Sequence, residues 1–83
     1  SSKYKQNQES EFLKTAINLL PQEPFDINTW DEWTSKINEK TRRSGKSLYM
    51  PLRLALTGLE KGPELRYLMP LLNKDLIKKK LGF

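Results

Sequence analysis

Apolar side chains recur at intervals of three and four residues along most of this chain, and prolines and glycines repeatedly interrupt them. That spacing places apolar side chains on one face of an α-helix, whereas a proline inside a helix removes a backbone hydrogen bond. The chain can therefore form only short helices that must pack together. For 83 residues without a strand pattern, we predict an all-α fold: a single domain over residues 1–83, built as a small multi-helical bundle of about four to five short helices.

The first half of the chain predicts two helices joined by a loop. The first helix is expected from about Glu9 to Leu20, where Pro21 ends it, and residues 1–8 are expected to be a flexible lead-in. The segment PQEPFD has two prolines and no periodicity, which is typical of a loop. The apolar stripe of the first helix comprises Phe12, Leu13, Ala16, Ile17 and Leu20.

The second helix is expected over about residues 30–41. Thr29 and Glu32 have the spacing of a capping box, in which the threonine hydroxyl accepts a hydrogen bond from the third helical amide. Trp30, Trp33 and Ile37 form a narrow apolar stripe. We interpret both tryptophans as core residues, with base stacking as the alternative.

A third helix is expected from Met50 to Thr57, with Pro51 in its first turn and Gly58 as its C-terminal cap. Arg53 lies about 100° around the helix from the buried stripe, so its side chain can point outward. The residues of that stripe are Leu52, Ala55, Leu56 and Leu59.

The end of the chain predicts two more short helices. Pro63 suits the first position of one helix, and Pro70 should kink or break it. Asn73 is expected to end that helix in the left-handed conformation. The segment KDLIKKKL predicts a last helix with three lysines, residues 78–80, near its C-terminus; the side chains expected to pack inward are Leu76, Ile77 and Leu81.

The composition excludes most catalytic chemistry for this chain alone. It has no cysteine and no histidine, so thiolate nucleophiles, zinc–thiolate sites and the commonest general base are absent. No phosphate-binding glycine loop or cluster of metal ligands is present either. No apolar run reaches the roughly 18 to 20 residues of a membrane span, and the start lacks the apolar segment of a signal peptide, so we expect a cytoplasmic location.

Basic residues gather in the second half of the chain. Residues 1–40 carry five lysines and seven acidic residues, whereas residues 41–83 carry ten lysines and arginines and three acidic residues. This asymmetry is expected of a surface that faces a polyanion, with a solvated lysine-rich surface as the alternative. The segment TRRSGKS is a candidate RNA-facing loop, or else a charged linker. The residues alone leave RNA binding and a helical protein-interaction module both open.

One continuous pattern adds a family resemblance. The string GKSLYMPLRLALTG, followed by GPEL and then by LLNKDLIKKKL, resembles the C-terminal end of bacterial-type glutamyl-tRNA synthetases, and the preceding TWDEWTSKINEKT does so too. The resemblance covers about Trp30 to Leu81. The family commonly has glycine near Arg42, where this chain departs from the pattern.

The resemblance implies a role for the fragment. It would be the C-terminal anticodon-binding subdomain of a longer class I synthetase, a glutamate–tRNA ligase that attaches glutamate to tRNA using ATP. ATP and Mg would belong to the missing catalytic domain, and no cofactor or metal is expected in this fragment. Its partners would be the anticodon loop of tRNA(Glu) and the remaining domains of the enzyme, with no membrane. The alternative is a helical protein-interaction module, or a non-specific RNA-binding domain of a synthetase paralogue.

The resemblance also carries over individual residues. Arg53 matches the family arginine that reaches an anticodon base, and Gly62, Pro63 and Leu65 match a turn that contacts an anticodon base. A structural ion pair of Arg53 with Glu60 or Glu64 is the alternative. Four further cations are expected to contact the phosphate backbone: Arg42, Arg43, Lys46 and Lys61.

Overall fold

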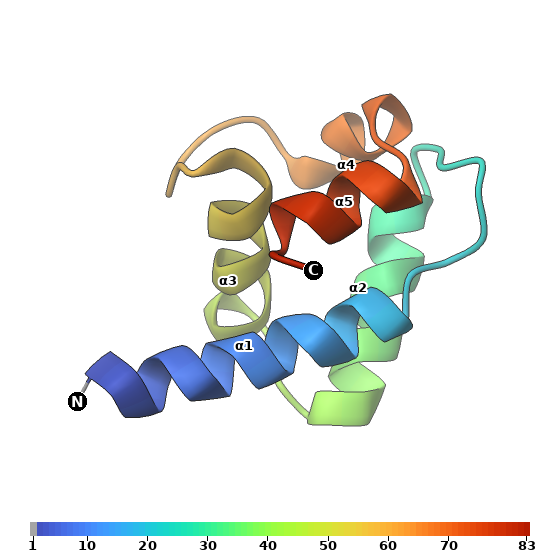
Figure 1. The fold of residues 1–83 in the computed structure, drawn as a ribbon. Helices are drawn as coiled ribbons and strands as arrows, with labels where there is room; N and C mark the ends of the chain where they lie inside the picture. The colour runs from blue at the N-terminus through green and yellow to red at the C-terminus, as the bar shows by residue number, and fades with distance from the viewer. Residues whose placement is uncertain (1) are drawn as a thin grey trace.

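The computed structural model describes the backbone of residues 2–83 and the side chains of residues 8–83. Within this range it contains no strand, and its helices in order are α1 (Ser2–Asn18), α2 (Thr29–Thr41), α3 (Lys46–Thr57), α4 (Leu65–Leu68), a 3-10 helix η1 (Met69–Leu71) and α5 (Lys74–Lys80) (Figure 1). The prediction of an all-α bundle of about four to five short helices is confirmed. None of the described helices is both long and apolar enough to cross a membrane.

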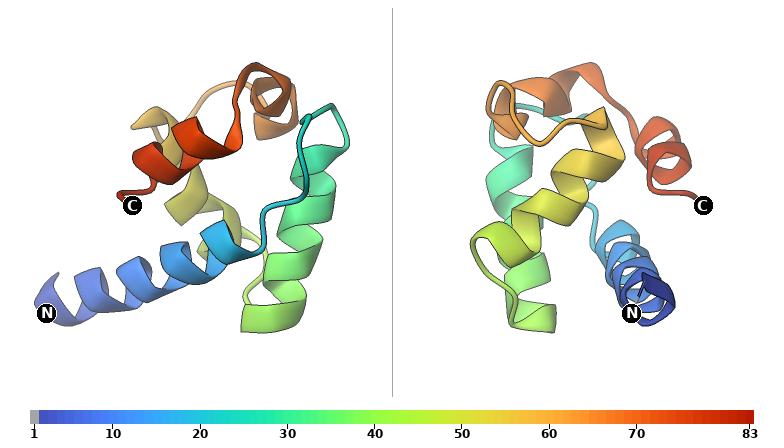
Figure 2. Two further views of the ribbon diagram at one scale, coloured as in Figure 1. Left: turned by 45° about the vertical axis from the view of Figure 1, so that its right-hand side comes forward. Right: turned by 90° about the vertical axis from the view of Figure 1, so that its left-hand side faces the viewer.

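The helices are arranged around α2, which packs against α1, α3, α4 and η1, while α3 also packs against α1 and α5. In Figure 1, α1 crosses in front of the lower parts of α3 and α2, and α5 lies above it. The right-hand view of Figure 2 shows α1 and α5 on one side of the molecule and α2 with the segment 58–64 on the other.

One apolar core joins the helices. Trp33 is fully buried, and its indole Nε1 donates a hydrogen bond to the carbonyl of Ala16 at 2.8 Å, which links α2 to α1. The rings of Trp30 and Trp33 pack edge to face with their centres 5.8 Å apart, but Trp30 stays partly exposed. Trp33 is thus a core residue as predicted, whereas Trp30 lies at the edge of the core. The largest fully buried side chains are Trp33, Ile37, Leu52, Met69 and Ile77.

The start and end of the first two helices differ in part from expectation. α1 begins at Ser2 and not near Glu9, so residues 2–8 are helical; Ser1, the rest of the predicted lead-in, lies outside the described residues. The predicted capping box is wrong. Thr29 already belongs to α2, and its hydroxyl accepts a hydrogen bond from the amide of Asp26 at 2.8 Å, because Asp26 organises the turn before the helix.

α3 begins at Lys46, four residues earlier than predicted, which places Pro51 inside the helix. Gly45 precedes the first turn with φ 56° and ψ −138°, a conformation that residues with a Cβ avoid. Pro51 has no N–H for the carbonyl of Ser47, its usual helical partner. The guanidinium of Arg43 donates to that carbonyl instead, at 3.2 Å from Nη1. The helix therefore tolerates an internal proline because a side chain replaces the missing donor.

The end of the chain corrects three further predictions. α4 begins at Leu65, and not at Pro63, because Glu64 is still extended. Asn73 does not end a helix: it is extended and caps the start of α5, where its Oδ1 accepts from the amide of Leu76 at 2.8 Å. Leu76 itself is 37% exposed and does not pack inward, unlike Ile77 and Leu81. The expected break at Pro70 is confirmed, since the chain passes there from α4 into the 3-10 helix η1.

Candidate functional site

Arg53 projects from α3 toward the segment that connects α3 to α4. Its Nη2 donates a hydrogen bond to the carbonyl of Pro63 at 3.0 Å. Because Pro63 lies before the helix and not in it, that carbonyl is available to Arg53. Among residues 8–83, Arg53 forms no ion pair with an acid, and Glu64 pairs with Arg66 at 3.4 Å instead. The structural ion pair considered as the alternative role is therefore not seen.

Gly62 allows the guanidinium to lie against the backbone. A Cβ at this position would stand 3.3 Å from Nη1 of Arg53, closer than such contacts normally are. A residue other than glycine would push the guanidinium aside by a few tenths of an ångström. The segment before α4 thus orients the guanidinium of Arg53 in two ways: the carbonyl of Pro63 accepts its hydrogen bond, and Gly62, which has no side chain, lets it lie close to the backbone.

A hollow of about 340 Å³ lies beside this guanidinium, and we call it the Arg53 hollow. It brings together the four residues that the resemblance assigned to base contact, Arg53, Gly62, Pro63 and Leu65. These residues come from α3, the connecting segment and α4, so only the folded chain joins them. The other lining residues are Thr57, Leu59, Lys61, Glu64, Tyr67, Leu68 and Leu71.

The sequence analysis missed the apolar wall of this hollow. Leu59 was expected in the core, but it follows the Gly58 cap and is 62% exposed. Tyr67 and Leu71 are 59% and 77% exposed. The sequence spacing could have indicated this exposure. Leu65 and Met69, four residues apart, mark the buried face of the helix, and neither Tyr67 nor Leu71 lies on that face. Large apolar side chains that face solvent around one hollow mark a binding surface.

The arrangement suits a flat, partly polar ligand. Apolar walls and a tyrosine ring offer faces for packing, and the guanidinium offers donors in a fixed plane. The backbone amides of Gly62 and Leu65 donate no hydrogen bond to the described part of the chain, and that of the exposed Gly62 is available to an acceptor. Unstacked bases in RNA loops are read by this combination of packing, arginine and backbone groups. Among the described residues, no group of three or more carboxylates could hold a metal ion.

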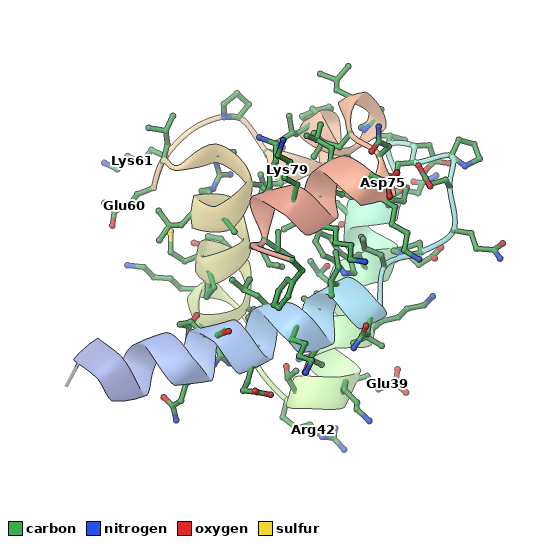
Figure 3. The ribbon with its side chains drawn as sticks, in the orientation of Figure 1. Glu39, Arg42, Glu60, Lys61, Asp75 and Lys79 are labelled. Atoms are coloured by element: carbon green, nitrogen blue, oxygen red, sulfur yellow. The ribbon has the colours of Figure 1, made fainter. Side chains whose placement is uncertain are left out.

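The cations expected at phosphates do not form one cluster. Lys61 lies at the Arg53 hollow, whereas Arg42 lies at the far end of the molecule (Figure 3). Lys46 begins α3 and, like Arg42, is exposed with no ion pair among the described side chains. Arg42 also ends α2 with a left-handed backbone, φ 64°, where glycine is favoured.

Arg43 differs from the other three cations because its guanidinium is already engaged. It lies 4.1 Å from the centre of the Phe12 ring, and its Nη1 pairs with Glu9 at 3.1 Å. The same nitrogen donates to the carbonyl of Ser47 in α3. Arg43 therefore joins α1 to the start of α3, and a phosphate contact for it stays a prediction.

Comparison with known proteins gives a consistent result. Residues 1–82 match a family model described as an anticodon binding domain. The chain is 51% identical over 76 residues to glutamate–tRNA ligase 1 of Orientia tsutsugamushi (strain Ikeda), a match that covers 92% of this chain and 17% of that protein. It is 58% identical over 64 residues to glutamate–tRNA ligase 1 of Chelativorans sp. (strain BNC1), covering 77% of this chain and 14% of that protein.

A third relative is glutamate–tRNA ligase 1 of Rickettsia bellii (strain OSU 85-389), 48% identical over 75 residues, with 90% of this chain and 17% of that protein covered. The chain therefore spans 14 to 17% of the length of these curated relatives. No solved structure matches it.

Proposed function

The chain belongs to the family of anticodon binding domains, and we propose that it is the C-terminal, anticodon-reading part of a glutamate–tRNA ligase that attaches glutamate to tRNA(Glu). In this role Arg53, Gly62, Pro63 and Leu65 contact anticodon bases. Lys61, Arg42, Lys46 and Arg43 are the proposed contacts to the phosphate backbone. The fragment recognises RNA and carries out no chemistry itself.

The Arg53 hollow is the observation that carries this proposal. A base that enters it meets an apolar wall, a guanidinium that is already oriented, and the free backbone amide of Gly62. Because the carbonyl of Pro63 and the close backbone at Gly62 restrict the guanidinium before RNA arrives, little side-chain freedom is lost on binding. Such preorganisation favours selective reading of a base over general attraction to phosphate.

The rest of the enzyme supplies the other functions in this proposal. ATP and Mg bind in the catalytic domain outside this chain, and the remaining domains hold the rest of the tRNA. Linkage to them raises the effective concentration of the anticodon loop at the hollow, so a modest affinity of the fragment is sufficient. The enzyme acts in the cytoplasm, where its tRNA and ATP are found.

The test is an amide chemical-shift titration of this chain with an anticodon stem-loop of tRNA(Glu), beside a stem-loop with a changed middle anticodon base. We expect shifts centred on Arg53 and residues 62–65 that weaken with the changed base. The variant Arg53→Ala should lose about 1 to 3 kcal/mol of binding free energy and most of the base preference. Lys14→Ala is the matched control, since Lys14 is an exposed cation on α1 without an ion pair among the described residues.

Two results would contradict the proposal. Shifts confined to the lysines at residues 78–80, with no response to the changed base, would indicate a general polyanion-binding surface. Equal losses for Arg53→Ala and Lys14→Ala would show that Arg53 contributes only charge.

A further inference from the structure

A second hollow, of about 330 Å³, lies between α2 and the start of α3, and we call it the Tyr49 hollow. Its wall includes Trp30 and Ser35 of α2 and Gly45 and Tyr49 at the start of α3. None of the family-derived site residues lines it. It lies apart from the Arg53 hollow, with which it shares no lining residue.

The two hollows are connected along one face of α3. Tyr49, Arg53 and Thr57 follow one another at intervals of four residues, which places them in a row on the helix surface. Tyr49 lines one hollow, while Arg53 and Thr57 line the other. From Tyr49 to Thr57 the row is about 12 Å long, at roughly 1.5 Å per residue. The leucines of α3 on the buried side hold this row in place.

The Tyr49 hollow offers aromatic edges together with unused hydrogen-bonding groups. Tyr49 is 40% exposed, and Trp30 is partly exposed. The indole Nε1 of Trp30, the hydroxyl of Ser35 and the hydroxyl of Tyr49 form no hydrogen bond with any side chain or backbone group that the structure describes. In a protein core, polar groups such as these normally have hydrogen-bond partners. In this hollow, an indole donor and two hydroxyl groups instead remain without a protein partner beside two aromatic rings.

Unpaired cations adjoin the Tyr49 hollow. No acidic residue lines it. Arg42 and Lys46 flank the lining residues Ser44 and Gly45 in the chain, and both cations are exposed with no ion pair among residues 8–83. Two acids also adjoin lining residues, Asp31 beside Trp30 and Glu39 beside Asn38, and Asp31 is paired with Arg66 at 3.4 Å. Aromatic rings combined with nearby cations are the equipment that holds bases and phosphates of single-stranded RNA.

We propose that the Tyr49 hollow is a second nucleotide-binding subsite, which takes another unstacked nucleotide of the RNA strand whose base occupies the Arg53 hollow. The inference rests on the proposed function, because it needs an RNA loop at Arg53. The spacing supports it: Tyr49 and Arg53 line different hollows and are four residues apart, about 6 Å along the helix, so adjacent bases that enter the two hollows cannot keep the roughly 3.4 Å spacing of a stack. Loops present bases in this form, whereas duplexes do not.

The two tryptophans provide an internal control for a test. A ¹H–¹⁵N titration of this chain with an anticodon stem-loop of tRNA(Glu) resolves both indole signals, and Trp30→Phe assigns them. The Trp30 signal should shift, because Trp30 lines the Tyr49 hollow. The Trp33 signal should stay in place, because its N–H is buried and bonded to the carbonyl of Ala16.

A matched pair of variants gives the second measurement. Tyr49→Leu removes an exposed ring from the hollow, whereas Phe83→Leu removes an exposed ring at the end of the chain. Tyr49→Leu should weaken stem-loop binding roughly fivefold or more, as expected for loss of stacking on one base. Phe83→Leu should leave the affinity within twofold. Circular dichroism melts show that both variants are folded before their affinities are compared.

The outcomes separate this inference from the proposed function. If amides of the Arg53 hollow shift while the Trp30 indole stays fixed and Tyr49→Leu binds like Phe83→Leu, the second subsite is refuted and the proposed function stands. If neither hollow responds to the stem-loop, both are refuted. Shift of the Trp30 indole together with the affinity loss of Tyr49→Leu supports the subsite.

Discussion

Replacing Arg43 by alanine should destabilise the domain more than any other single loss of a surface cation. Three contacts disappear together. The partly exposed ion pair with Glu9 contributes about 0.2 to 1 kcal/mol, and the stacking on Phe12 about 0.5 to 1 kcal/mol. The hydrogen bond to the carbonyl of Ser47 contributes about 1 kcal/mol. The expected loss is therefore about 2 to 3 kcal/mol, a large fraction of the stability of a small domain.

The assay is thermal and urea unfolding followed by circular dichroism. For a domain of this size, a loss of about 2 kcal/mol lowers Tm by roughly 8 to 16 °C. Arg42→Ala removes the neighbouring charge, and Arg42 has no ion pair among the described residues, so its Tm should change by only a few degrees. Arg43→Lys keeps the charge but loses the planar stack on Phe12, and it should fall between the two.

A double-mutant cycle tests the physical reason. Pro51→Ala restores the amide that normally bonds to the carbonyl of Ser47, so Arg43→Ala should cost less in that background than in the original chain. If Arg43→Ala melts like Arg42→Ala but binds the stem-loop more weakly, Arg43 serves RNA and not the fold, and the reasoning is wrong. An equal cost in both backgrounds would refute the link to Pro51.

Three further changes have defined outcomes. Arg42→Gly should relieve the strain of the left-handed backbone and stabilise the domain by about 1 kcal/mol, so a lower Tm would contradict this prediction. The same change should lower the slope of log affinity against log salt by about 0.7, because one phosphate contact is lost. Gly62→Ala should displace the guanidinium of Arg53 and weaken stem-loop binding by about 1 kcal/mol, and an unchanged affinity in a calorimetric titration would refute this. Trp33→Phe should cost about 2 to 3 kcal/mol in urea unfolding, since it removes a buried hydrogen bond and leaves a cavity, and a smaller cost than that of Trp30→Phe would show that the core is assigned wrongly.

Much of the fold could be predicted because its signals are local. The helical spacing of apolar residues, the cap at Gly58 and the break at Pro70 each depend on the chemistry of a few neighbouring residues, although α1 ends at Asn18 and not at Leu20 as predicted. The errors arose where one residue type serves two local roles. Asn73 can end a helix or begin one, and only its hydrogen bond to the next helix decides which.

The candidate site also has a part that the sequence indicated and a part that only the structure shows. The family resemblance pointed to Arg53 and the turn at residues 62–65, and their contact with anticodon bases stays a prediction. It could not show that Leu59 and Tyr67 complete an apolar wall beside them. Exposure depends on which face of one element another element covers, and that is settled only when the helices pack.

By itself, then, the sequence determined the helical fold class and the C-terminal ends of α2 and α3, since these follow from spacing and backbone preference. Only the tertiary structure decided where the guanidinium of Arg43 lies, because Glu9 and Phe12 of α1 hold it beside the carbonyl of Ser47. The same packing placed the Tyr49 and Arg53 hollows in a row along α3. Both features depend on groups from different segments meeting in space, and the spacing of residues along the chain carries no information about such meetings.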